Sequence, residues 1–315
     1  MNDTATTQPT SYKPHLALIA VQLIFGTWPI VGKIALRALP STGLVAFRVV
    51  GATLAFLLIR RATKSVPIKS KTDYALLALY SLLGVVLNQF LFVKGLELST
   101  AINAALLGAT IPIFTLLVSV VLGYESSSWR VVVGLLLAVG GVVYLINPAQ
   151  ASFSHETNVG NLILILNSFA YGAYIAISQG LIKRYGALTV ITWIFIFGSF
   201  VTLPVGGYQL SKISLLTVPS NVWLAVLYII IVPTVGAYYL NAWALGRVAP
   251  SVVAIYIYLQ PLIAFAAAPL VLGEHLNSRT WFATALIFAG VATVTLRARS
   301  RAIEEVSERP EALGH

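Results

Sequence analysis

Long apolar runs dominate this sequence and limit what the chain can fold into. A run of about 20 apolar residues is long enough to cross the roughly 30 Å hydrocarbon core of a bilayer as a helix. Ten such runs can be read, separated by breakers that include Pro40, Pro67 and Pro219. They span about 16–36, 43–60, 73–94, 99–123, 129–147, 159–182, 187–206, 221–244, 250–273 and 280–297. We therefore predict an all-α integral membrane protein with ten transmembrane helices.

The composition agrees with a bilayer environment and excludes several kinds of chemistry. Only 10% of the residues are charged and the mean hydropathy is +0.88, whereas soluble proteins carry about 25% charged residues. The chain has no cysteine, which excludes disulfides and thiol catalysis. Its four histidines stand far apart, so we expect no metal site and no cofactor. The net charge of +10 is spread over the gaps between apolar runs, which favours lipid over nucleic acid as a partner.

The distribution of lysine and arginine predicts how the helices are oriented. These residues are retained on the cytoplasmic side of a membrane, and most of them fall on one side if the N-terminus is inside. We therefore predict cytoplasmic tails at 1–15 and 298–315 in a multi-pass protein of the cell (inner or plasma) membrane. The first apolar run is too long for a secretory signal and lacks a small-residue cleavage site, so we expect it to stay in the mature protein.

The two halves of the chain correspond at a fixed offset. A shift of 149 residues aligns four pairs, which are Leu96 with Leu245, Pro112 with Pro261, Glu125 with Glu274, and Gly141 with Gly290. The matching segments, 16–147 and 159–297, each contain five predicted helices. Because five is an odd number, the second repeat enters the membrane from the opposite side. Inverted repeats are typical of secondary transporters, whose substrate sites lie near the midplane where the repeats meet.

Several short motifs resemble a known family. They are Phe25-Gly26 followed by Lys33, Arg48 in the second run, GLELSTA at 95–101, ALGRVAP at 244–250, the paired prolines, and LGYE and LGE before the fifth and tenth runs. Together they resemble the EamA-like branch of the drug/metabolite transporter superfamily. The resemblance implies a basket of helices 1–4 and 6–9 around a central cavity, with helices 5 and 10 outside. The sequence departs from the family where Phe25 stands in place of a frequent tryptophan and where LGYE has one residue more than LGE.

Polar and aromatic residues inside the apolar runs are the candidates for the lining of such a cavity. Polar groups are expensive in hydrocarbon unless they face a partner or water. The alternatives are hydrogen bonds between helices and, for aromatic residues near helix ends, contact with the membrane interface. The candidates are Trp28, Asn88, Phe92, Asn103, Asn167, Tyr171, Tyr174, Ser178, Tyr238, Asn241, Tyr256 and Gln260.

Lys33 and Arg48 are the two charges placed well inside predicted helices. One interpretation is a positive site for a substrate carboxylate or phosphate, strengthened by the low dielectric constant. The other is that their long side chains reach the outer lipid headgroups. We favour the headgroups for Lys33 and leave both interpretations open for Arg48.

Prolines and glutamates mark the positions where helices bend or end. Pro29, Pro112 and Pro261 lie inside predicted helices, where each removes a backbone donor and loosens the preceding turn. Tyr256 and Gln260, before and beside the second of the paired prolines, have apolar counterparts in the first half, which favours a role in specificity. Glu125 and Glu274 end the fourth and ninth helices, and we expect them to pair with Arg130 and Arg279. Gating through those pairs is the alternative.

These features predict a secondary transporter that moves small organic metabolites by alternating access. Amino acids or related zwitterions are favoured because the candidate residues are aromatic or amide-bearing with few fixed charges. Export is expected by analogy alone, and with no carboxylate at the midplane we favour facilitated diffusion or exchange. The alternatives are a carrier of phosphorylated or anionic metabolites or of drugs, a channel, and an intramembrane enzyme, for which no catalytic cluster is visible. The protein is expected to be a monomer or a homodimer.

Overall fold

The computed structural model describes residues 12–63, 66–124, 129, 133–134, 136–137, 140–141, 144, 156–248, 250–290 and 293. All regular structure within these ranges is helical. Eight helices there are long and apolar enough to cross a membrane. They coincide with the first four predicted runs and with runs six to nine, and their ends differ from the predicted ends by a few residues.

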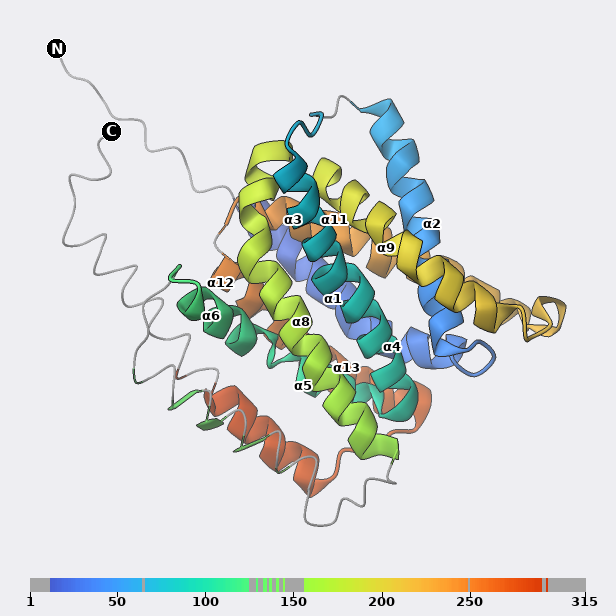
Figure 1. Ribbon diagram of the computed structural model, residues 1–315. Helices are drawn as coiled ribbons and strands as arrows, with labels where there is room; N and C mark the ends of the chain where they lie inside the picture. Colours follow the sequence, from blue (N-terminus) through green and yellow to red (C-terminus); the bar gives the residue numbers. More distant parts are fainter. Residues whose placement is uncertain are drawn as a thin grey trace.

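The first half contains four of these helices. Two are continuous, and each of the other two is divided into segments by a change of helix type or by a turn (Figure 1). The continuous helices are α1 (Lys13–Ala35) and α2 (Ser41–Ala62). The third helix consists of α3 (Lys71–Ser81), the π-helical segment η1 (Leu82–Leu87) and α4 (Asn88–Leu98), and the fourth consists of α5 (Ala101–Gly108) and α6 (Ile111–Val121).

The second half repeats this order. Its continuous helices are α8 (Glu156–Tyr185) and α9 (Ala187–Leu210), followed by the short 3-10 turn η2 (Leu215–Thr217). The next helix consists of α10 (Ser220–Ile229), the π-helical η3 (Ile230–Gly236) and α11 (Ala237–Leu245). The last of the eight consists of α12 (Pro250–Ile255), the 3-10 turn η4 (Tyr256–Tyr258) and α13 (Leu259–Leu272).

The fourth helix of each half changes course just before its predicted proline. In the first half, residues 109–110 form a turn between α5 and α6, and Pro112 follows. In the second half η4 precedes Pro261. A proline has no N–H and its ring collides with the carbonyl four residues earlier, so the α-helix is interrupted there. At this turn the carbonyl of Leu107 accepts hydrogen bonds from the hydroxyls of Thr110 (2.6 Å) and Ser168 (3.0 Å). Pro29, in contrast, lies within the uninterrupted α1.

The packing joins the two halves across each other. The first helix of one half packs against the third and fourth helices of the other: α1 contacts α11 and α13, while α8 contacts α4 and α6. The second helices of the two halves, α2 and α9, lie side by side (Figure 1). Their approach is so close that a Cβ atom on Gly206 of α9 would collide with Ala46 and with the carbonyl oxygen of Thr42 on α2. Glycine permits this contact because it has no side chain.

The predicted fifth and tenth helices are described only in part. A helix at 278–290 corresponds to the start of the tenth run and lies at the edge of the bundle, in red in Figure 1. It packs against the fifth run, since Gly141 lies directly against Ala283 and Ile287 and the ring of Tyr144 is 4.8 Å from that of Phe282. Residues 1–11 and 294–315 lie outside the described residues. The count of ten, the inverted repeat and the side of the membrane on which each tail lies stay predictions.

Candidate functional site

A cavity lies among the eight long helices. Seven of them contribute residues to its wall, and α9 does not. The space free of protein atoms is about 500 Å³ including solvent at its mouth, but the centres of water-sized molecules can occupy only about 60 Å³ of it. A water needs roughly 10–15 Å³ by this measure, so the cavity has room for a few waters. Its wall is formed by Phe25, Trp28, Arg48, Asn88, Gln89, Phe92, Gly108, Ile111, Asn167, Tyr171, Tyr238 and Gln260.

Arg48 is the charged residue of this wall. Its side chain comes from α2 and only 1% of the residue is exposed. The guanidinium carbon lies 3.9 Å from the centre of the Trp28 ring, and Nε donates to the Thr234 hydroxyl at 3.1 Å. Trp28 stacks in turn on Phe92 with 5.8 Å between the ring centres. A headgroup contact would need an exposed guanidinium, so the headgroup interpretation of Arg48 is not supported by this geometry.

Tyr238 connects the third helices of the two halves. Its hydroxyl donates to Oδ1 of Asn88 at 2.7 Å and accepts from Nε2 of Gln89 at 2.6 Å. Gln89 and Tyr238 are 149 residues apart, which is the offset between the repeats. The predicted correspondence thus relates two residues that touch each other at the cavity.

The long helix α8 places two predicted residues at the cavity, and both form hydrogen bonds to neighbouring helices. Nδ2 of Asn167 donates to the carbonyl of Asn88 at 2.8 Å. The Tyr171 hydroxyl accepts from Nδ2 of Asn241 at 3.2 Å. Asn241 therefore lies behind Tyr171 and does not itself line the cavity. Asn167 and Tyr171 therefore line the cavity and also form hydrogen bonds between helices, so the two interpretations of these residues are compatible.

Gln260 comes to the cavity from α13, directly before Pro261. Its Nε2 donates to Oε1 of Gln22 on α1 at 2.6 Å, and Gln22 is 1% exposed. The residue that corresponds to Gln260 in the first half is Ile111, and it also lines the cavity. One amide and one aliphatic side chain therefore occupy matching places in the wall.

Other predicted residues are not brought into the cavity wall. Nδ2 of Asn103 donates to Oδ1 of Asn161 at 3.2 Å, where α5 and α8 meet. Tyr174 is buried and stacks on Tyr171, and Ser178 is fully buried one turn further along α8. The Tyr256 hydroxyl bonds to Nδ1 of His15 at 2.8 Å, near the start of α1.

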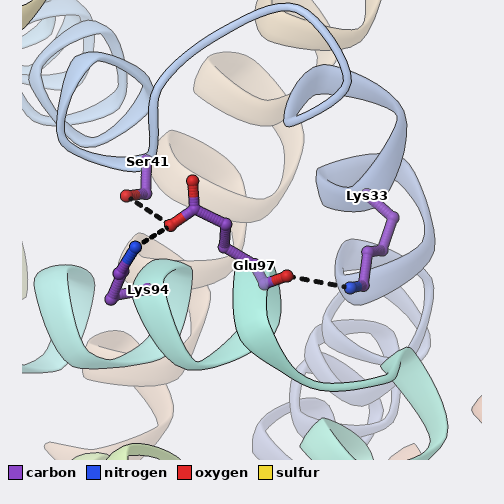
Figure 2. Close-up of polar contacts among 4 residues, drawn as sticks. All are labelled: Lys33, Ser41, Lys94 and Glu97. Carbon is purple, nitrogen blue, oxygen red and sulfur yellow. Dashed lines mark hydrogen bonds and ion pairs between the residues drawn. The ribbon is translucent and has the colours of Figure 1, made fainter. Parts of the chain in front are cut away.

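Lys33 also lies away from the cavity, in a polar cluster near the end of α4 that Figure 2 shows. Its ammonium group donates to the main-chain carbonyl of Glu97 at 3.4 Å. The Glu97 carboxylate accepts from the Ser41 hydroxyl at 3.0 Å and forms an ion pair with Lys94. The cluster thus joins the ends of α1 and α4 to the start of α2.

Glu274 has a partner different from the predicted one. Its two carboxylate oxygens accept from the backbone N–H groups of Ala101 (2.7 Å) and Ile102 (2.9 Å), the first two residues of α5. The expected pairing with Arg279 is therefore corrected. The positive N-terminal end of a helix takes the place of a basic side chain. Glu125 lies outside the described residues.

Four residues of the cavity wall are not among the predicted ones, namely Phe25, Gln89, Gly108 and Ile111. The 149-residue offset could have found two of them, because it pairs Gln89 with Tyr238 and Ile111 with Gln260. Gly108 is the last residue of α5 and gave no signal, whereas Phe25 belongs to the Phe25-Gly26 motif but was not assigned to the cavity because it is apolar among apolar neighbours. In the described part of the chain, no group of three His, Asp or Glu side chains could hold a metal ion.

A polytopic helical protein whose polar and aromatic cavity is lined by both halves of the chain is built like a membrane carrier. The model of the EamA-like transporter family matches residues 13–147 and 158–296, and the chain belongs to that family. It is a multi-pass membrane protein of a transporter family.

Known relatives agree with this family membership. The chain is 25% identical to the uncharacterized transporter YetK of Bacillus subtilis, over 90% of this chain and 87% of that protein. It is 27% identical to the uncharacterized inner membrane transporter YedA of Escherichia coli K12, over 89% and 90%. It is 25% identical to the WAT1-related protein At3g18200 of Arabidopsis thaliana, over 95% and 86%. A solved crystal structure shares the fold with a TM-score of 0.65 at 21% identity, over 91% of this chain and 98% of that one.

Proposed function

We propose that this protein is a secondary carrier of small organic metabolites, with amino acids or related zwitterions as the first choice of substrate, and that it exports them. The observation that carries the proposal is the cavity, which combines an aromatic wall, several amides and one buried cation between the two halves of a transporter-family chain. Such a wall suits a small amphipathic molecule, because the rings contact its apolar part and the polar groups fix its orientation. The proposal includes a multi-pass location in the inner membrane and both tails in the cytoplasm.

The small volume of the cavity fits a carrier that must open to one side at a time. With room for only a few waters, the cavity has to widen before a metabolite can enter. The interruptions between α5 and α6 and at η4 supply places where the fourth helix of each half can bend. We propose that each half, 16–147 and 159–297, acts as one repeat and that the two rock against each other.

The alternative substrates and mechanisms fit the cavity less well. A phosphorylated metabolite carries about two negative charges and calls for several cations, whereas Arg48 is the cation among the residues that form the wall. A channel would need a ring of charged side chains or a carbonyl filter along a pore, and the described wall has one charge. An intramembrane enzyme would need a nucleophile with a base, and the wall contains neither an acidic residue nor a histidine.

Counterflow in liposomes tests the proposed function. Purified protein is reconstituted, the vesicles are loaded with a high concentration of one unlabelled amino acid, and uptake of the same labelled amino acid from outside is followed. A carrier shows transient accumulation of label that depends on the internal load, because the loaded site returns faster or more often. Each of the twenty standard amino acids is tested in this way, with protein-free vesicles as control. Absence of trans-stimulation for all of them, together with linear uptake of small ions, would favour a channel.

A further inference from the structure

Arg48 is a buried cation with no counter-charge from the described part of the chain. Four acidic residues fall within the described ranges, and none of them forms an ion pair with Arg48: Asp73 pairs with Arg184, Glu97 pairs with Lys94, Glu274 caps α5, and Glu156 lies in the exposed first turn of α8. A guanidinium held inside a membrane protein without an anion is energetically unfavourable. The ring of Trp28 offsets part of that cost through its negative face.

Most of the hydrogen-bonding capacity of Arg48 is not used by the residues that the structure describes. A guanidinium has five N–H donors arranged as a fork that fits a carboxylate. Among the described residues, the hydrogen bond that Arg48 makes is the one from Nε to Thr234. The terminal nitrogens therefore remain as donors at a residue that lines the cavity.

Gln89 supplies the opposite kind of group at the same cavity. Gln89 is 1% exposed, and its Nε2 donates a hydrogen bond to the Tyr238 hydroxyl. Its Oε1 is buried and has no hydrogen-bond partner among the described residues. An acceptor buried without a donor is costly, so a ligand that brings an N–H group would be stabilised there.

We propose that Arg48 binds the carboxylate of the transported substrate and that Oε1 of Gln89 accepts a hydrogen bond from its ammonium or amino group. The apolar part of the substrate then packs against Trp28, Phe25 and Phe92. The cavity thereby selects molecules with a carboxylate and an N–H donor close together, as in an α-amino acid. This inference rests on the proposed function and assigns the two groups that determine its substrate class.

A purely structural role for Arg48 would also hold α1, α2 and η3 together through Trp28 and Thr234. The two roles differ in what they predict for ligands. A structural arginine affects all ligands alike, whereas an arginine that binds a carboxylate affects only ligands that carry one. The experiment therefore varies the ligand and the residue at the same time.

Ligand-induced thermal stabilisation of the purified protein measures binding without transport. The twenty standard amino acids are screened, and the strongest stabiliser is compared with its carboxamide and with its deaminated acid in the wild type, in Arg48→Gln and in Gln89→Met. We expect amidation to weaken binding to the wild type roughly 10- to 100-fold, as for loss of a hydrogen bond to a charged group. In Arg48→Gln the acid and the amide should bind within a factor of about two of each other. Deamination should likewise weaken binding to the wild type and matter little in Gln89→Met.

Lys212→Gln is the matched control, because Lys212 is an exposed cation that stacks on Tyr208 outside the cavity. It should keep the wild-type preference for the acid. If Arg48→Gln does not fold, Arg48→Lys retains the charge without the fork and should reduce the preference for the acid.

Three results would overturn the inference. They are that no amino acid stabilises the wild type at millimolar concentration, that acid and amide bind equally well to the wild type, or that their ratio is unchanged in Arg48→Gln. Counterflow separates this from the proposed function: transport of compounds that lack a carboxylate would leave the carrier intact and remove the inference. Binding with the expected preferences but without any transport would support the two binding groups and contradict the proposed carrier function.

Discussion

Individual polar residues in this protein are used in pairs that cross between helices. Gln22 with Gln260 and Asn88 with Tyr238 each join an element of one half to an element of the other, and Asn241 with Tyr171 joins two helices of the second half. In hydrocarbon such a pair removes two polar groups from lipid at once. Arg48 and Oε1 of Gln89 stand out because the described protein supplies no anion to the first and no donor to the second.

The pair Gln22 and Gln260 can be tested by removing one partner and then both. Gln260→Leu leaves the buried Oε1 of Gln22 without its donor, and we expect a loss of about 1–3 kcal/mol of stability. Adding Gln22→Leu removes the orphaned group, so the double variant should recover much of the loss. Melting temperatures in detergent measure both effects.

If the loss of stability in the double variant equals the sum of the losses in the two single variants, the hydrogen bond does not contribute to stability. The same Gln260→Leu protein also tests the proposed role of Gln260 in specificity. An unchanged order of ligands in the thermal screen would remove that role.

Glu274 gives a second prediction for a single residue. Its carboxylate caps α5 with two hydrogen bonds, and loss of an N-terminal cap costs about 0.5–2 kcal/mol. We expect Glu274→Ala to lower the melting temperature and Glu274→Gln, which keeps one acceptor oxygen but no charge, to fall between Ala and the wild type. A Glu274→Ala protein that melts with the wild type would contradict the capping role.

The irregular segments of the long helices lie at corresponding places in the two halves. The π-helical segments η1 and η3 occupy the same place in the third helix of each half, and the interruptions before Pro112 and Pro261 occupy the same place in the fourth. Each of these interruptions is followed within three residues by a proline, which cannot donate the backbone hydrogen bond of a continuous helix. Pro233 lies within η3, whereas η1 has no proline, so proline does not account for both π segments.

The contact between α2 and α9 predicts opposite effects for two neighbouring glycines. A Cβ on Gly206 would collide with Ala46 and Thr42, whereas a Cβ on Gly207 would meet nothing within 4 Å. Because alanine is favoured over glycine inside a helix by roughly 0.5–1 kcal/mol, Gly207→Ala should hold or raise the melting temperature. Gly206→Ala should lower it, since overpacking costs about 1–3 kcal/mol. Equal shifts in the two variants would mean that α2 and α9 are not in close contact.

At the scale of the whole molecule, the exchange of partners between halves places the cavity. The first helix of each half packs on the third and fourth helices of the other, so the wall contains residues from both halves and any movement between them changes its volume. We regard this arrangement as the physical basis for alternating access in the proposed carrier.

The predicted orientation in the membrane can be tested directly because the chain has no cysteine. Ser214 lies in an exposed loop predicted to be outside, and Lys69 lies in an exposed segment predicted to be cytoplasmic. In intact cells, a membrane-impermeant maleimide should label Ser214→Cys but not Lys69→Cys. Both should react after permeabilisation. The reverse pattern would invert the predicted topology and with it the proposed direction of transport.

Features that depend on a continuous stretch of chain could be predicted from the residues alone. Span length, the satisfaction of backbone hydrogen bonds within a helix and the effect of proline are local. The eight long helices and the interruptions at Pro112 and Pro261 could therefore be read from the residues, and the motifs gave the family. Eight of the residues proposed for the cavity also lie in its wall.

Which face of each helix is turned toward the cavity depends on how the helices pack and could not be predicted from the residues. In a membrane helix nearly every face is apolar, so hydrophobic periodicity does not distinguish a lipid-facing side from an inward one. That is why Asn103 and Tyr256 proved to bond elsewhere and why Gln89 was missed. Glu274 has its partner 173 residues away in the chain, and such a contact is set by how the helices pack.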